Sequence, residues 1–72
     1  MDLTSKEDSD YVKVYVNGLL HLHFLRKHYR GMSSYNNGVY TIELALQDQN
    51  ITLEYHKREH WEAMLGVLDD LL

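Results

Sequence analysis

An α+β fold is predicted for this chain: a four-stranded antiparallel β-meander followed by one C-terminal amphipathic helix that packs on one face of the sheet (ββββα). Three features of the sequence predict it. Apolar and polar residues alternate in four segments, which is the pattern of half-buried strands. Asn-Gly pairs and clusters of polar residues separate the segments and indicate turns. Toward the C-terminus the apolar spacing changes to three and four residues, the period of a helix.

The composition of the 72-residue chain disfavours several classes of protein. It contains no cysteine, which excludes disulfides and thiolate metal sites and favours a reducing compartment, so a cytoplasmic location is expected. No apolar stretch approaches the roughly 20 residues of a membrane span, and no membrane partner is expected. The formal net charge of −4 disfavours a protein whose main partner is duplex DNA.

Residues 1–9 are polar, mostly acidic and without periodicity, so they are predicted to form a mobile N-terminal tail outside a single domain of residues 10–72. The domain begins with two alternating segments, residues 11–16 and 19–24, on either side of Asn17-Gly18. Asn and Gly tolerate the positive φ angles of a tight turn, so the two segments are predicted to form a hairpin.

Two registers compete for this hairpin. A two-residue loop pairs Tyr15 with Leu20 and mixes apolar and polar residues on both faces. A three-residue loop, with Gly18 as the bulge residue, pairs Tyr15 with Leu19 instead. It segregates Val12, Val14, Leu20, Leu22 and Phe24 on one face from Tyr11, Lys13, Tyr15, His21 and His23 on the other. Because a slip of one residue exchanges the two faces, the three-residue loop is expected.

The middle of the chain contains a basic run and a turn-rich segment. The run Arg26–Arg30 is interleaved with aromatic residues. The segment Gly31–Gly38 is predicted to be a loop, although Asn37-Gly38 is also compatible with the tip of a second, short hairpin.

Two further alternating segments, Val39–Leu46 and Ile51–Tyr55, are predicted to be the third and fourth strands. The four-residue loop between them pairs Leu44 with Leu53. In that register Glu43 lies opposite Glu54 on the outer face of the sheet.

A stripe of apolar residues predicts the C-terminal helix. Its members are Trp61, Met64, Leu65, Leu68, Leu71 and Leu72. No Ser, Thr, Asp or Asn stands at the expected N-cap, and Asp69 and Asp70 oppose the helix dipole at the other end. The helix is therefore expected to depend on packing against the sheet.

No residue pattern indicates catalysis. The serines and threonines stand in no nucleophile elbow or triad-like setting, and no Gly-rich loop could cradle a phosphate. Glu43 and Glu54 would be a carboxylate pair, but on an open sheet face their side chains can bend apart into water. A protein that is not an enzyme, with no cofactor and no small-molecule substrate, is expected.

The five histidines raise the question of a metal site. His56 and His60 are spaced four apart, and His21 and His23 share one strand face. The segment lacks the metalloprotease spacing, because Lys57 follows the first histidine, and no ordered set of four ligands is evident. No metal site is expected.

The strongest functional signal is the sheet face that a single helix leaves uncovered. Its expected protein-binding residues are Tyr11, Lys13, Tyr15, His21 and His23. Aromatic residues with mixed charge suit protein interfaces, and a domain of this size gains stability from further burial. We expect a small non-catalytic protein-binding module, an adaptor or inhibitor of a larger assembly of the bacterial or phage regulator type, that binds another protein or itself as a homodimer.

The alternative is a module that binds single-stranded nucleic acid through the basic run. In this run, which begins at Arg26, tyrosine and arginine side chains such as Tyr29 would stack on unpaired bases, while Lys27 and Arg30 would meet phosphates. The ordinary role of such a run is a solvated strand end, and the acidic net charge favours that role over a nucleic-acid site.

Overall fold

A computed structural model describes residues 2–72, with Glu7 described by its backbone alone, and shows six strands in two antiparallel sheets. The first sheet has the order β1–β2–β3, with β1 at Leu3–Glu7, β2 at Tyr11–Val16 and β3 at Leu19–Leu25. A 3-10 turn, η1 at Arg26–His28, leads to the second sheet, which has the order β4–β5–β6. It contains β4 at Tyr29–Asn36, β5 at Tyr40–Leu46 and β6 at Asn50–Tyr55, and the helix α1 follows at Arg58–Leu71.

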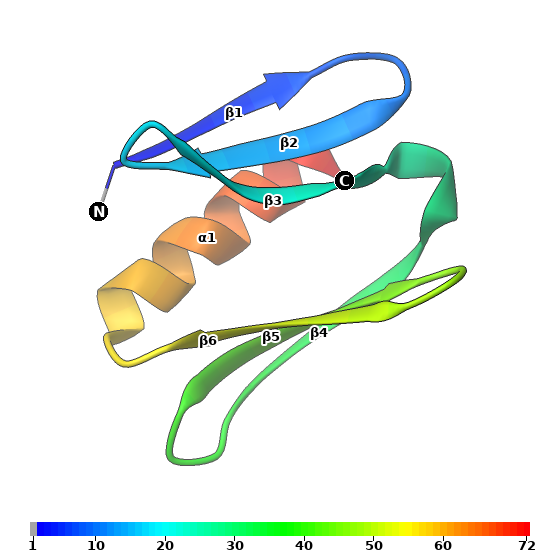
Figure 1. Ribbon diagram of the computed structural model, residues 1–72. Coiled ribbons are helices and arrows are strands. Elements are labelled where there is room, and N and C mark those ends of the chain that lie inside the picture. Colours follow the sequence, from blue (N-terminus) through cyan, green and yellow to red (C-terminus); the bar gives the residue numbers. More distant parts are fainter. Residues whose placement is uncertain (1) are drawn as a thin grey trace.

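The two sheets lie one above the other, and α1 runs along one side of the pair (Figure 1). The helix contacts β1 of the first sheet and β5 and β6 of the second. One hydrophobic core joins the inner faces of both sheets to the helix: Val12, Val14, Leu22 and Phe24; Ile42, Leu44, Leu46, Leu53 and Tyr55; and Met64, Leu68 and Leu71. The α+β class is confirmed, but the single four-stranded meander is wrong. The four predicted strands are β2, β3, β5 and β6, and they divide between two sheets.

Strand β1 comes from the segment 1–9 that the sequence predicts to be a tail. It pairs with β2 so that Leu3 lies opposite Val16 and Glu7 opposite Val12. The turn between the strands is held by Asp8, whose Oδ1 accepts hydrogen bonds from the backbone N–H groups of Asp10 (2.9 Å) and Tyr11 (2.6 Å). A polar edge strand is possible because its pairing rests on backbone hydrogen bonds, which need no apolar alternation.

The first hairpin combines the two registers that compete at the sequence level. Its loop has two residues, Asn17 and Gly18, with φ angles of 51° and 82°, so Tyr15 pairs with Leu20 and the expected three-residue loop is wrong. The register then shifts by one residue at a bulge, beyond which Val14 lies opposite Leu22. The bulge restores the segregation of the faces that a two-residue loop alone would destroy. Leu20, expected in the core, lies outside the bulge and is 54% exposed.

The second sheet contains a further strand that the sequence does not predict. The segment Gly31–Gly38, expected as a loop, supplies most of β4, which pairs along β5 from Met32 opposite Leu44 to Asn36 opposite Tyr40. Gly38 forms the turn with a φ angle of 81°, as the alternative hairpin requires. Like β1, β4 is an edge strand with polar side chains, and hydrophobic periodicity does not reveal it.

The pairing of β5 with β6 differs by two residues from the predicted register. Leu44 lies opposite Ile51, and Glu43 lies opposite Thr52, so the expected pair of Glu43 with Glu54 is wrong. Since side chains alternate with a period of two, this shift leaves every residue on its predicted face. The inner faces are therefore correctly predicted even though the cross-strand partners are not.

The helix has the predicted apolar stripe, with Met64, Leu68 and Leu71 buried. Its N-cap, Lys57, makes no side-chain capping hydrogen bond. At the other end, Nη1 of Arg26 donates to the carbonyl oxygen of Leu71 and places a positive charge where the helix dipole favours one. Within residues 2–72, no helix has the length and apolar composition that a membrane crossing needs.

Candidate protein-binding face

The outer face of the first sheet carries four of the five predicted protein-binding residues on paired strands. We define the basic face by Lys6, Tyr11, Lys13, Tyr15, Leu20 and His23, which the registers of β1, β2 and β3 place together. The alternation of β2 produces this face, because Val12 and Val14 between its members are fully buried. The fifth predicted residue, His21, is exposed at the bulge of β3.

Three of these side chains form one compact group. The rings of Tyr11 and His23 lie with their centroids 4.9 Å apart and tilted by 38°. The ammonium nitrogen of Lys13 lies 5.8 Å from the centroid of the Tyr11 ring, within the range of a cation–π contact. Lys13 also pairs directly with His23 across the two strands. The group therefore presents an aromatic surface with a positive charge held beside it.

Lys6 lies directly opposite Lys13 in the register of β1 and β2. Like charges at directly opposed positions destabilise a sheet. Among the residues whose side chains the structure describes, no carboxylate forms an ion pair with either lysine. Hydrogen bonds from the backbone N–H groups of Tyr11 and Asp10 lower the pKa of the Asp8 carboxyl, and the nearby charge of Lys13 lowers it further, so Asp8 compensates Lys13 in part without forming an ion pair. A negatively charged partner would relieve the remaining repulsion between the two lysines.

An apolar border continues the basic face toward the hairpin tip. Tyr15 is half-buried between Thr4 and Leu20, and Leu19 at the tip is 75% exposed. A shallow hollow of about 310 Å³ beside Tyr15 is lined by Thr4, Ser5, Lys6, Tyr15 and Gly18.

Sequence reasoning missed Lys6 because the first segment has no strand pattern. It placed Leu20 inward, although the preference of Asn-Gly for two-residue loops indicates the observed turn.

The basic run proposed for nucleic acid does not form one surface. Arg26 bonds to the end of α1, and Tyr29 packs against the hydrophobic core. Arg30 is exposed but donates to Oε1 of Gln47 at 3.1 Å and to the carbonyl oxygens of Lys27 (3.2 Å) and Tyr29 (3.3 Å). Lys27 is exposed. The structure therefore brings together Lys27 and Arg30 on the surface and directs Arg26 and Tyr29 elsewhere.

The histidines do not meet in a shared site. In the part of the chain that the structure describes, no three His, Asp or Glu side chains are grouped so as to hold a metal ion. Nδ1 of His28 lies 3.7 Å from Oδ1 of Asp48.

The outer face of the second sheet has the opposite charge. We define the acidic face by Ser33, Tyr35, Glu43, Asn50 and Glu54, which come from β4, β5 and β6. Tyr35 donates its hydroxyl to Oε1 of Glu43 at 2.9 Å, and this hydrogen bond to the carboxylate raises the pKa of Tyr35 above its ordinary value of 10.0.

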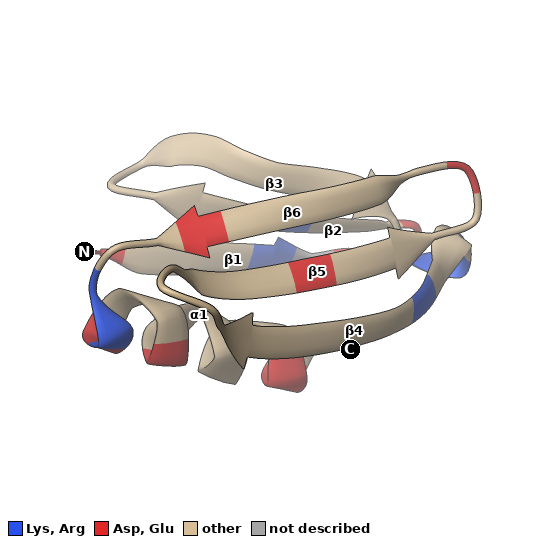
Figure 2. Cartoon of the chain, turned by 90° about the horizontal axis from the view of Figure 1, so that it is seen from below, with Lys and Arg blue, Asp and Glu red and all other residues tan. Residues whose placement is uncertain are grey.

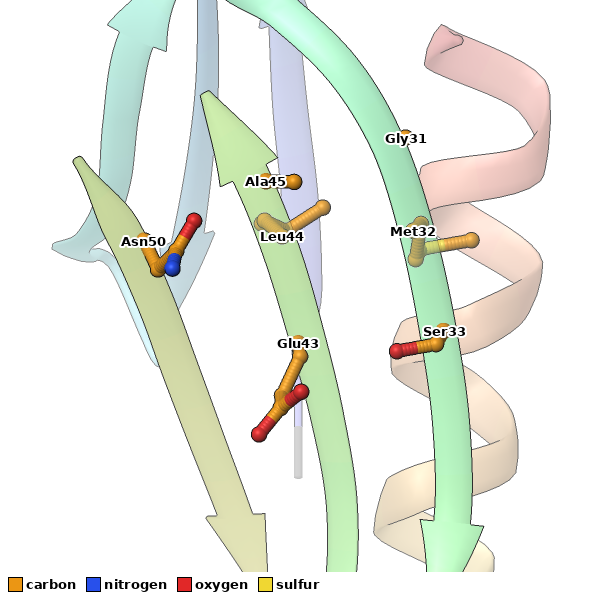
Figure 3. A pocket seen from close by; sticks show the side chains of 7 residues that line it. All are labelled: Gly31, Met32, Ser33, Glu43, Leu44, Ala45 and Asn50. Carbon is orange, nitrogen blue, oxygen red and sulfur yellow. The ribbon is translucent and has the colours of Figure 1, made fainter. Parts of the chain in front are cut away.

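A hollow of about 260 Å³ lies on this face around Glu43 (Figure 3). Gly31 and Ala45 contribute little side chain to it, while Ser33, Glu43 and Asn50 supply a hydroxyl, a carboxylate and an amide from three neighbouring strands. The sequence does not reveal this hollow, because its members become neighbours only through the pairing of β4 with β5.

No protein-family model matches this chain, and no curated protein or solved structure is significantly similar to it.

Proposed function

We propose that the protein is a non-catalytic protein-binding module that captures an acidic surface of a partner protein on its basic face. The observation that carries this proposal is the opposed pair of Lys6 and Lys13, which has no ion-pair partner among the described side chains. A sheet that keeps two directly opposed lysines at a cost in stability is suited to binding an anion there.

The aromatic and apolar neighbours would supply most of the affinity. Exposed ion pairs contribute only about 0.2–1 kcal/mol each, so two lysines alone would bind weakly. Tyr11 and Tyr15 can bury a large area with little loss of rotamer freedom, and such residues dominate the energetics of interfaces. The lysines then select an acidic partner, and the aromatic rings hold it. This combination suits an adaptor or an inhibitor that covers a site on a larger protein.

Binding of a dye-labelled peptide rich in glutamate and tyrosine tests this proposal. The wild type is expected to bind it with an affinity that falls as salt is added, because the charges are exposed. The variant Lys6→Gln/Lys13→Gln is expected to lose about two- to thirtyfold in affinity, because it removes two exposed ion pairs worth about 0.2–1 kcal/mol each. The variant Lys27→Gln/Lys57→Gln removes the same charge from elsewhere on the surface and is expected to bind as the wild type does. Equal losses in the two variants would show that net charge, and not this face, attracts the peptide.

Single-stranded nucleic acid is the second candidate, and it rests on the exposed neighbours Lys27 and Arg30. A gel shift with short oligonucleotides at low and moderate salt tests it. Salt-sensitive binding that Lys27→Ala/Arg30→Ala abolishes and Lys6→Gln/Lys13→Gln leaves intact would favour this candidate over the first. Arg26 is left unchanged here, because it contacts the end of α1.

A further inference from the structure

The basic face and the acidic face lie on opposite sides of the molecule. The first sheet is above and the second below in Figure 1, and each turns its inner face to the shared core. Figure 2 views the second sheet from outside, where acidic segments appear on both β5 and β6. The acidic residues of those strands are Glu43 and Glu54, which the register places outward. One chain thus presents two complementary surfaces that cannot meet within the same molecule.

The acidic face has no cation to neutralise it among its described residues. Glu43 lies between Ser33 and Thr52 on the flanking strands, and Glu54 lies opposite Thr41. The basic residue within these strands is Arg30, which stands at the bulge that begins β4 and donates to Gln47. Lys57 and Arg58 follow β6 at the start of α1, where Arg58 pairs with Glu62. Oε1 of Glu43 accepts a hydrogen bond from the Tyr35 hydroxyl, but neither carboxylate forms an ion pair among the described side chains, so each can receive a cation brought by another molecule.

We infer that the protein associates with itself head to tail, the basic face of one copy docking on the acidic face of the next. This inference rests on the proposed function of the basic face and names a second copy of the chain as its partner. Charge complementarity selects this occupant, since each face supplies two charges of the sign that the other lacks. Lys13 of one copy enters the hollow beside Glu43 of the next, where a hydroxyl and an amide also accept hydrogen bonds from its ammonium.

The hollow has room for such a side chain. Its volume of about 260 Å³ corresponds to several water molecules at about 30 Å³ each. The ammonium group and the last methylenes of a lysine need no more than this. Gly31 and Ala45 at its border leave the approach open, because they carry no long side chain.

The placement of the faces also determines the symmetry of the assembly. A two-fold dimer formed through either outer face would set lysines against lysines or glutamates against glutamates. The head-to-tail contact avoids this repulsion, but it leaves a free basic face at one end and a free acidic face at the other. Such a heterologous contact adds further copies unless the rotation between them closes a ring. The expected assembly is therefore a series of oligomers and not a closed homodimer.

Sedimentation velocity with two single-face variants tests the inference. The wild type is expected to increase in mass with concentration at low salt and to return to a monomer at high salt. The variants Lys6→Gln/Lys13→Gln and Glu43→Gln/Glu54→Gln are each expected to remain monomeric under the same conditions. Their equimolar mixture is expected to form a complex of two chains and no larger species, because only one intact junction is available. The charge-matched variant Asp69→Asn/Asp70→Asn, altered on the exposed side of the helix, is expected to associate as the wild type does.

Four results would overturn the inference: a wild type that stays monomeric at every concentration, a single-face variant that associates like the wild type, a mixture that stays monomeric, or a mixture that grows beyond two chains. The peptide-binding measurement distinguishes failure of the self-association inference from failure of the proposed function. If the glutamate-rich peptide binds to the wild type and to Glu43→Gln/Glu54→Gln but not to Lys6→Gln/Lys13→Gln, the basic face binds acidic partners even where no self-association is found.

Discussion

Trp61 donates its indole N–H to the carbonyl oxygen of Thr41 at 3.1 Å, and this bond ties the first turn of α1 to β5. The Trp61 ring also lies against Tyr40, with centroids 5.3 Å apart and an interplanar angle of 41°. These two contacts hold the beginning of the helix against the second sheet, while its buried residues Met64, Leu68 and Leu71 pack in the core. They explain how a helix without a side-chain N-cap is held at its beginning.

Replacement of Trp61 by alanine is expected to lower the free energy of unfolding by about 3 kcal/mol. Large-to-small changes of this kind cost about 3–5 kcal/mol when the side chain is fully buried, and Trp61 is partly buried. Trp61→Phe keeps a ring against Tyr40 and loses only the hydrogen bond, so a loss of about 1 kcal/mol is expected. Urea unfolding followed by circular dichroism measures both. A Trp61→Ala protein within a few tenths of a kcal/mol of the wild type would show that the helix is held by other contacts.

The contact of Arg26 with the carbonyl oxygen of Leu71 predicts a second stability effect. Arg26→Gln is expected to lower the free energy of unfolding by about 1.5 kcal/mol, because it weakens a charge-assisted hydrogen bond and removes a cation from the negative end of the helix dipole. Amide hydrogen exchange is expected to quicken most in the last turn of α1. The adjacent change Lys27→Gln, at an exposed side chain, is the control and should leave both measurements unchanged. If Arg26→Gln and Lys27→Gln lowered stability equally, the contact of Arg26 with the end of α1 would not be the cause.

Tyr55 is 8% exposed, and its hydroxyl is the one buried side-chain polar group without a hydrogen-bond partner among the residues that the structure describes. A buried hydroxyl without a partner costs about 1–3 kcal/mol of desolvation. Tyr55→Phe keeps the ring in the core and is expected to leave stability unchanged or raise it by up to about 1 kcal/mol. A loss of more than 1 kcal/mol in urea unfolding would mean that the hydroxyl does form a bond in solution.

Alkaline pH is expected to destabilise the fold through two tyrosines. Burial raises the pKa of Tyr55, and the hydrogen bond to Glu43 raises the pKa of Tyr35, both from an ordinary value of 10.0. Unfolded tyrosines therefore lose their protons first as the pH rises. The contribution of these two tyrosines to the stability of the fold is fully present below about pH 10. It is lost as the pH rises through the raised pKa values that they have in the folded protein. Thermal unfolding between pH 8 and pH 11 measures the decline, which should be shallower in Tyr35→Phe/Tyr55→Phe than in the wild type. If stability declined equally with pH in the variant and in the wild type, groups other than Tyr35 and Tyr55 would be responsible.

Local patterns predict most of the side chains that face the core, and one exception is Leu20, which the bulge of the first hairpin leaves 54% exposed. Val12 and Val14 are buried as their alternation with polar neighbours indicates, and Met64 and Leu68 follow from the period of the helix. These assignments depend only on the spacing of neighbours along the chain, so they held even where the cross-strand register differed. Alternation alone places Tyr11 and Lys13 on one face of β2, and His23 joins them through the hairpin that Asn17-Gly18 indicates.

Tertiary structure alone decided which strands pair and how the sheets divide. Strands β1 and β4 are polar edges whose formation rests on backbone hydrogen bonds to a neighbour, and no side-chain pattern in their own segments indicates that neighbour. Lys6 therefore joined the basic face, and Ser33 the hollow at Glu43, only when those strands paired. The sequence by itself determined the faces, because side-chain periodicity is local. The tertiary structure decided the composition of both binding surfaces, because these surfaces consist of residues that become neighbours only through long-range pairing.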